Sequence, residues 1–229
     1  GRDYLARRFA AEGLSTHIDA AGNLIGRWAG SDIDAPVLMT GSHSDTVPSG
    51  GRFDGIAGIL CGLAAIGALR RAGYQPTHTI ELVDFLAEEP SEWGLSCIGS
   101  RGMAGALTDA HLAMRGPGGE RLDDAITRMG GRPIAIAETV RGDVAAFIEI
   151  HIEQGPVLEA ENVPLGIVTG IAGIARLRLR LEGEAGHAGT VPMAMRKDAG
   201  MAMARLMLAL RDAAHIEADS GRGHFTATI

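Results

Sequence analysis

The sequence predicts an α/β fold, in which a mostly parallel, mixed sheet is covered by helices and a smaller α+β part follows. Three apolar runs, Pro36–Thr40, Thr79–Ala87 and Ala145–Ile152, have the length and composition of buried strands. The nearly all-apolar helical pattern Ile56–Ala72 separates the first two. Buried strands that alternate with helices are typical of an open α/β sheet.

The remaining elements are expected in the following order. Leu5 and Phe9 repeat at helical spacing, and Gly13 ends that first helix as a left-handed cap would. Short β-rich runs follow at residues 16–19 and 23–28. The pattern of polar and apolar residues changes near Val168–Gly170. Beyond this point residues 175–181 alternate strictly between Arg and Leu or Ala, as in a strand with one solvated face. An amphipathic helix over residues 192–214 and a β-rich run over 225–229 complete this part, so we expect one domain over residues 1–169 and a second over 170–229.

Composition narrows the class of function. The 229 residues are 46% hydrophobic and only 4% aromatic, and the formal net charge is −7 with 21 scattered Lys and Arg residues. Nucleic-acid binding needs basic residues gathered on one face, so a small-molecule substrate is the better expectation. Two cysteines, no apolar run long enough for a membrane span and no basic-then-apolar leader predict a cytoplasmic protein without disulfides.

Residues able to bind metal follow each of the three strand-like runs. His43 and Asp45 follow the first, at the edge where open α/β sheets collect their ligands. Asp54 lies between glycines just before the long helix, where its carboxylate could bridge two cations. An imidazole at a strand end can bind a metal, and Asp45 could orient it as an outer partner.

The second and third runs add further candidates. Glu88 and Glu89 are adjacent carboxylates, which repel each other unless a cation lies near them. A metal would resolve this, with Glu89 as ligand and Glu88 as the base that takes a proton from activated water. His151 and Gln154 follow the third run, and the amide is a candidate substrate contact.

Each of these residues also has a structural interpretation. A single strand-end His is more often a hydrogen-bonded polar residue than a ligand, and Glu-Glu before Pro is more often a solvated turn. His187, flanked by glycines in a turn, would by itself be interpreted as a loop residue that caps the next helix. Cys61 lies in an apolar helical pattern where a buried thiol is inert, and nothing in the sequence marks Cys97 as activated. The candidates at the strand ends indicate a functional site only when they are considered together.

Six motifs in this order resemble the M20 metallopeptidase superfamily, in its branch of N-carbamoyl-L-amino acid hydrolases, allantoate amidohydrolases and β-ureidopropionases. They are Gly41-Ser42-His43-Ser44-Asp45-Thr46-Val47, Gly51–Gly55, Ala87-Glu88-Glu89, Gly99-Ser100-Arg101, His151–Glu159 and Gly186-His187-Ala188-Gly189. The run His-Ile-Glu-Gln-Gly-Pro at 151–156 is the most branch-specific, because the peptidase branches usually carry an acidic residue at the position of His151.

The resemblance implies a zinc-peptidase-like catalytic domain and a lid domain through which two subunits dimerise. It implies two divalent cations (Zn, Mn, Co or Ni), one held by His43, Asp54 and His151 and the other by Asp54 and Glu89. By the same resemblance Asp45 orients His43, and Glu88 is the general base and then the general acid. His187 would be the lid histidine that polarises the scissile carbonyl across the dimer interface, and Gln154 would contact the substrate.

One departure from the family pattern concerns the second cation. The family supplies a further His to it from a segment after the lid, and this sequence ends inside the lid-like part. The chain also starts directly in a helical pattern without Met, so a fragment with one incomplete metal site and weak or no activity is expected. The resemblance predicts hydrolysis of the carbamoyl C–N bond of N-carbamoyl-L-amino acids or allantoate-like compounds. An M20 dipeptidase or aminoacylase, and a non-catalytic dimeric binding protein derived from such an enzyme, are the alternatives.

Overall fold

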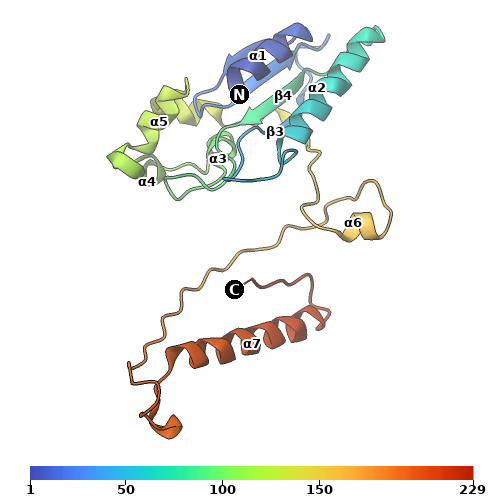
Figure 1. Cartoon of the computed structure of the whole chain (residues 1–229). Helices are drawn as coiled ribbons and strands as arrows, with labels where there is room; N and C mark the ends of the chain where they lie inside the picture. The colour runs from blue at the N-terminus through green and yellow to red at the C-terminus, as the bar shows by residue number, and fades with distance from the viewer. Residues whose placement is uncertain (229) are drawn as a thin grey trace. The chain divides into compact units, whose positions relative to one another are not determined.

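The chain contains two compact units, Gly1–Glu161 and Asn162–Ile229, in a computed structural model that describes residues 1–228 (Figure 1). The division falls after Glu161, whereas the sequence pattern placed it after residue 169. The first unit therefore contains all three of the strands whose ends carry the candidate ligands.

A five-stranded mixed sheet forms the centre of the first unit, in the order β1-β2-β4-β3-β5. The strands are β1 (Ser15–Ile18), β2 (Leu24–Trp28), β3 (Val37–His43), β4 (Ile80–Phe85) and β5 (Val144–Ile148). β1 pairs with β2 and β2 with β4 in antiparallel fashion, whereas β3 is parallel to both β4 and β5. The predicted α/β class is confirmed, and the three strands that deliver the site are the parallel ones.

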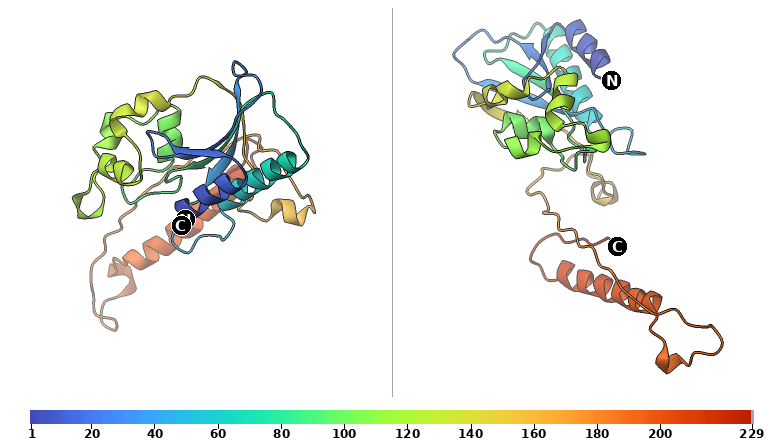
Figure 2. Two further views of the ribbon diagram at one scale, coloured as in Figure 1. Left: turned by 90° about the horizontal axis from the view of Figure 1, so that it is seen from above. Right: turned by 90° about the vertical axis from the view of Figure 1, so that its left-hand side faces the viewer.

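Helices cover both faces of this sheet (Figure 2). On one face, α1 (Arg2–Ala11) and α2 (Ile56–Arg71) bury Phe9, Ile59 and Leu63 against residues of β2 and β4. On the other face, α3 (Ile98–Met103) packs Met103 against Met39 of β3 and Val83 of β4. Leu82 and Val83 are neighbours that belong to opposite clusters, because successive side chains of a strand point to opposite faces.

The sequence patterns did not predict the short helices between β4 and β5. These are α3, α4 (Asp109–Leu112), η1 (Pro117–Gly119), α5 (Leu122–Arg128) and η2 (Pro133–Thr139). None exceeds seven residues, so none shows the repeated apolar spacing by which longer helices are recognised. Leu122 and Ile126 of α5 pack against Ile98 of α3 and Ile136 of η2 in a small core of their own.

Two expectations about burial are wrong. Of the run predicted as a buried strand at residues 145–152, only residues 145–148 lie in a strand. That strand is β5, an edge strand whose Phe147 and Ile148 are 43% and 68% exposed. β5 pairs with β3 alone among the described residues, so its outer edge and much of its side-chain surface face solvent. Cys61 is exposed on α2, because the buried stripe of that helix is formed by Ile59, Leu63 and Ile66 with three glycines.

The second unit consists mainly of one helix, α7 (Ala199–Ala218), preceded by the short η3 (Met193–Met195); α6 (Val157–Ala160) belongs to the first unit. The helix predicted over residues 192–214 is therefore present, but it begins seven positions later, at Ala199 after the N-cap Asp198, and ends at Ala218. The strands predicted at 175–181 and 225–228 are absent; residue 229 lies outside the described part. A strand needs a partner for its backbone hydrogen bonds, and the described chain offers none here, so Leu177 remains 83% exposed.

Among residues 1–228, no helix combines the length and hydropathy that crossing a membrane would require.

Candidate metal centre

The carboxyl ends of β3, β4 and β5 bring the candidate ligands to one edge of the sheet. His43 is the last residue of β3 and pairs in register with Phe85, the last residue of β4. Glu88 and Glu89 follow β4, and His151 follows β5. Because the three strands are parallel, their side chains meet at the edge where open sheets bind ligands.

His43, Asp54 and His151 form the tightest group. The two Nε2 atoms are 3.4 Å apart, and Nε2 of His151 is also 3.4 Å from Oδ1 of Asp54. His43 and Asp54 are buried, whereas His151 lies at the surface. The imidazole rings are stacked with 5.7 Å between their centroids.

The outer ring nitrogens determine which atoms face the centre of this group. Nδ1 of His43 lies 2.8 Å from the carbonyl oxygen of Asp45, and Nδ1 of His151 lies 2.9 Å from that of Ile152. A carbonyl oxygen can only accept, so both Nδ1 atoms donate, and each neutral ring then presents a bare lone pair on Nε2. Two lone pairs and a carboxylate oxygen that face one another repel unless a cation lies between them. About 3.3 to 3.4 Å separates two nitrogens bound tetrahedrally to one zinc ion, so the donor set fits a divalent metal.

A second group of donors shares His43. Oε2 of Glu88 lies 3.7 Å from Nε2 of His43, and Glu89 belongs to the same cluster. Burial raises the pKa of Glu89, and the nearby carboxylates of Asp54 and Glu88 raise it further. Accumulated negative charge of this kind is what a second cation would relieve.

Asp45 connects the two groups through its backbone and its side chain. Its carbonyl accepts from His43, while its carboxylate accepts from the backbone N–H groups of Glu88 at 3.2 Å and Glu89 at 3.1 Å. The carboxylate itself is 3.7 Å from Nδ1 of His43. The predicted orienting role is thus available to the carbonyl, and the carboxylate additionally fixes the turn after β4.

Gln154 lies beside the metal-ligand candidates. It has a left-handed φ of 56°, and its side-chain amide donates to both oxygens of Asp54, at 3.1 and 3.0 Å. Non-glycine residues in this conformation are uncommon and concentrate at functional sites. Contact with substrate remains a prediction for this residue.

Two residues of this region escaped the sequence patterns. Asp84 is fully buried one position before the end of β4, accepts a hydrogen bond from Ser44 at 3.0 Å and lies 3.4 Å from Nε of Arg2. Burial raises the pKa of Asp84, although Arg2 opposes the shift. Cys97 places its thiol 3.5 Å from Oε1 of Glu88, and burial followed by that carboxylate raises the pKa of the thiol. The sequence did contain a signal for Asp84, which is a charged residue inside the apolar run Val83-Asp84-Phe85. No sequence feature marks Cys97.

Gly55 is required by the geometry of His43. Its φ is +63°, and a Cβ at this position would lie 2.4 to 2.5 Å from three atoms of the His43 ring. We expect Gly55→Ala to displace the imidazole and to weaken Mn²⁺ or Zn²⁺ binding by at least about tenfold, the equivalent of one modest contact. Isothermal titration of the metal would measure this, with Gly94→Ala as control, because that glycine also has a positive φ but nothing within 4 Å. Equal metal affinity in the two variants would contradict the expectation.

His187 belongs to the second unit, where it lies on an exposed loop before α7.

Comparisons with known proteins agree on one family. The model of peptidase family M20/M25/M40 matches residues 39–227. An N-carbamoyl-L-amino acid amidohydrolase of Geobacillus stearothermophilus is 40% identical over 215 residues, which cover 93% of this chain and 53% of that protein. A ureidoglycolate hydrolase of rice is 40% identical over 220 residues, covering 91% of this chain and 46% of that protein.

The fold comparison gives the same result. A hydantoinase/carbamoylase family amidase from Burkholderia ambifaria superposes with a TM-score of 0.74 at 37% identity, covering 95% of this chain and 53% of the amidase. The chain thus spans about half the length of the relatives it matches. Divalent metal binding is a property of this metallopeptidase family, and the donor groups around His43 are consistent with it. On the family match and these identities, the chain belongs to peptidase family M20/M25/M40.

Proposed function

We propose that this chain carries the metal-binding core, and part of the lid, of an amidohydrolase that cleaves the carbamoyl C–N bond of N-carbamoyl-L-amino acids or allantoate-like compounds. The observation that carries the proposal is the close approach of three donor atoms: Nε2 of His151 lies 3.4 Å from Nε2 of His43 and 3.4 Å from Oδ1 of Asp54. The names of the relatives support the substrate class, since they include N-carbamoyl-L-amino acid amidohydrolases and an allantoate amidohydrolase of Bacillus subtilis.

His43, Asp54 and His151 would hold one divalent cation, and Asp54 with Glu89 would contribute to a second. Imidazole and carboxylate ligands suit Zn, Mn, Co or Ni, so availability rather than ligand type would select among them. Bound at these positions, divalent cations lower the pKa of water and stabilise negative charge on a carbonyl oxygen.

Glu88 is the proton carrier in this proposal. Its backbone N–H is fixed by Asp45, and its carboxylate reaches toward His43 with one oxygen and toward the thiol of Cys97 with the other. The carboxylate takes the proton of the attacking water, whose oxygen bonds to the carbonyl carbon. The C–N bond then breaks, and the departing nitrogen receives that proton from Glu88.

Gln154 and His187 would act on the substrate. Gln154 lies beside Asp54, so a rotation of its amide away from that carboxylate would present it to a bound molecule. His187 would donate to the scissile carbonyl oxygen and so stabilise the charge that develops there.

The test is a substrate panel with the full-length gene product. We expect turnover of N-carbamoyl-L-amino acids or allantoate that a chelator abolishes and added Mn²⁺ or Zn²⁺ restores. A preference for dipeptides or N-acyl amino acids would favour the dipeptidase or aminoacylase alternative. Less than one bound cation per chain, without turnover of any substrate, would favour the non-catalytic binding protein.

A homodimer that forms through the second unit is also part of the proposal. It is supported by exposed apolar residues of that unit, among them Leu177, Leu179 and Met201. Light scattering on the full-length protein would measure its mass, and a monomer at all concentrations would exclude the dimer.

A further inference from the structure

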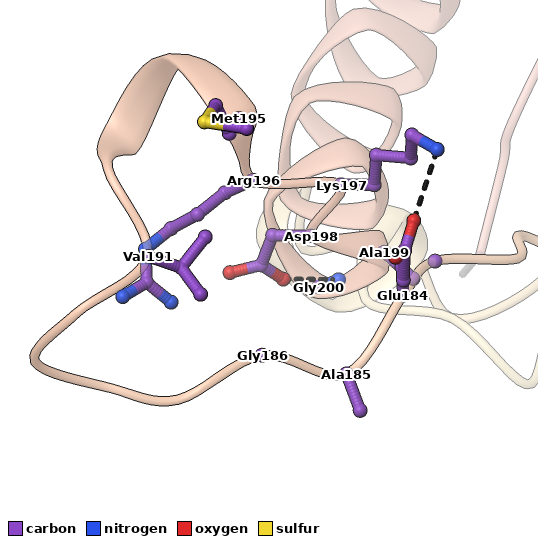
Figure 3. A pocket seen from close by; sticks show the side chains of 11 residues that line it. Glu184, Ala185, Gly186, Val191, Met195, Arg196, Lys197, Asp198, Ala199 and Gly200 are labelled. Atoms are coloured by element: carbon purple, nitrogen blue, oxygen red, sulfur yellow. Dashed lines mark hydrogen bonds and ion pairs between the residues drawn. The ribbon is translucent and has the colours of Figure 1, made fainter.

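The loop that carries His187 is closed at its base. We call residues 183–197 the His187 loop. The N–H of Glu184 donates to the carbonyl of Lys197 at 2.9 Å, and the side chains of the same two residues form an ion pair at 2.9 Å (Figure 3). Immediately afterwards Asp198 caps α7 by accepting from the N–H groups of Gly200 and Met201. The loop therefore returns to the first turn of a 20-residue helix.

Arg196 fixes the backbone at His187 itself. Its Nη2 donates to the carbonyl oxygens of His187 at 3.2 Å and Ala188 at 2.6 Å. The side chain extends from the segment before α7 toward Val191, across the pocket that the loop encloses (Figure 3). A guanidinium group is planar and always charged, so these two bonds tie two successive peptide units to one rigid group.

The imidazole of His187 is fixed separately, by the backbone of Gly189. The N–H of Gly189 donates to Nδ1 of His187 at 3.1 Å. A backbone N–H can only donate, so Nδ1 must be the acceptor, and a neutral ring then carries its proton on Nε2. The ring therefore presents a donor at its far end, which is what a histidine that polarises a carbonyl oxygen needs.

We propose that Arg196 and the N–H of Gly189 are positioning groups that present His187 as a preset Nε2–H donor to the carbonyl oxygen of the substrate. The inference rests on the proposed function of His187 and adds the means by which its tautomer and orientation are set. In this proposal both groups act through His187: Arg196 holds the peptide units of His187 and Ala188, and the N–H of Gly189 holds the ring.

The tautomer is tested by the imidazole ¹⁵N shifts of His187 in this chain, assigned by comparison with His187→Gln. The matched pair is Gly189→Pro, which removes the N–H, and Gly189→Ala, which keeps it. A Cβ on residue 189 would lie 3.7 to 3.8 Å from the His187 ring, an ordinary contact, so the alanine fits. We expect the Nε2–H form to dominate in the wild type and in Gly189→Ala, and the Nδ1–H form to gain population in Gly189→Pro. The same tautomer ratio in all three proteins would overturn the assignment of Gly189.

The consequence for turnover is tested in the full-length enzyme. We expect Gly189→Pro and Arg196→Met each to lower kcat about tenfold with little change in KM. Without these groups the Nε2–H of His187 is no longer preset, and the transition state loses stabilisation equivalent to about one hydrogen bond. Gly189→Ala, Lys197→Met, which removes only an exposed ion pair, and Arg196→Lys, which keeps a donor, should lose less. Far-UV circular dichroism, which sums the signal of all helices, would verify that Arg196→Met and Gly189→Pro keep the helical content of the wild type.

His187→Ala separates the two levels of the proposal. If it leaves kcat unchanged, the proposed catalytic role of His187 fails, whatever the ¹⁵N shifts show. If His187→Ala lowers kcat but Gly189→Pro and Arg196→Met match their controls, the role of His187 stands and the positioning proposal is overturned.

Discussion

Glu88→Gln is expected to lower kcat of the full-length enzyme by about 10²- to 10⁴-fold, the range that general acid–base catalysis contributes. Glutamine has nearly the shape of glutamate but cannot take up the proton of water or return it to the departing nitrogen. The backbone bond from residue 88 to Asp45 is unaffected by the change, so the turn after β4 and the adjacent Glu89 keep their positions. Metal content, measured by atomic emission, should therefore equal that of the wild type.

Glu92→Gln is the matched control for this variant. Glu92 is an exposed residue four positions further along the chain, outside both groups of possible ligands. It undergoes the same change of charge and should keep wild-type turnover. Wild-type kcat in Glu88→Gln would remove Glu88 from the mechanism, whereas loss of bound metal would assign it to the ligands instead.

Gly41→Ala should destabilise the fold by about 2 to 6 kcal/mol, the sum of backbone strain and overpacking. Gly41 lies inside β3 with a φ of +146°, and its Cβ would lie 2.0 Å from the carbonyl oxygen of Val83 on β4. Two backbones cannot separate at this point without breaking the parallel pairing that ends at His43. Urea unfolding of this chain would measure the shift in midpoint.

Gly142→Ala provides the comparison for that experiment. Gly142 lacks a positive φ, and nothing lies within 4 Å of where an added Cβ would be. The urea midpoint of Gly142→Ala should therefore stay close to that of the wild type. Equal midpoints in Gly41→Ala and Gly142→Ala would show that the strand pair tolerates the added methyl group.

The sequence predicted those parts of the fold that rest on local periodicity. The apolar runs that became β3 and β4, and the helical pattern that became α2, lie within a few residues of their expected positions. The gathering of His43, Asp54 and His151 could be anticipated because parallel strands end at one edge of a sheet, although the role of these residues as ligands stays a prediction.

Other features depend on contacts between distant residues, which no local pattern encodes. Arg2 meets Asp84 across 82 positions, and the thiol of Cys97 reaches Glu88 only because α3 packs back against β4. An edge strand can have the same apolar composition as an interior strand and differs from it only in its neighbours. The apolar run that contains β5 was therefore expected to be buried. The alternating Arg and Leu residues at 175–181 have strand periodicity but lack a pairing partner in the described chain.

The register between β3 and β4 has a consequence for folding experiments. His43 and Phe85 are the final pair of a ladder in which Leu38 is matched to Ile80. Displacement of β3 by a single residue would turn His43 to the opposite face of the sheet, away from Asp54 and His151. If the chain binds a cation as proposed, native metal affinity after refolding would show that β3 and β4 have this register. Metal titration would then count only the correctly assembled molecules, whereas circular dichroism would also count sheets with a shifted register.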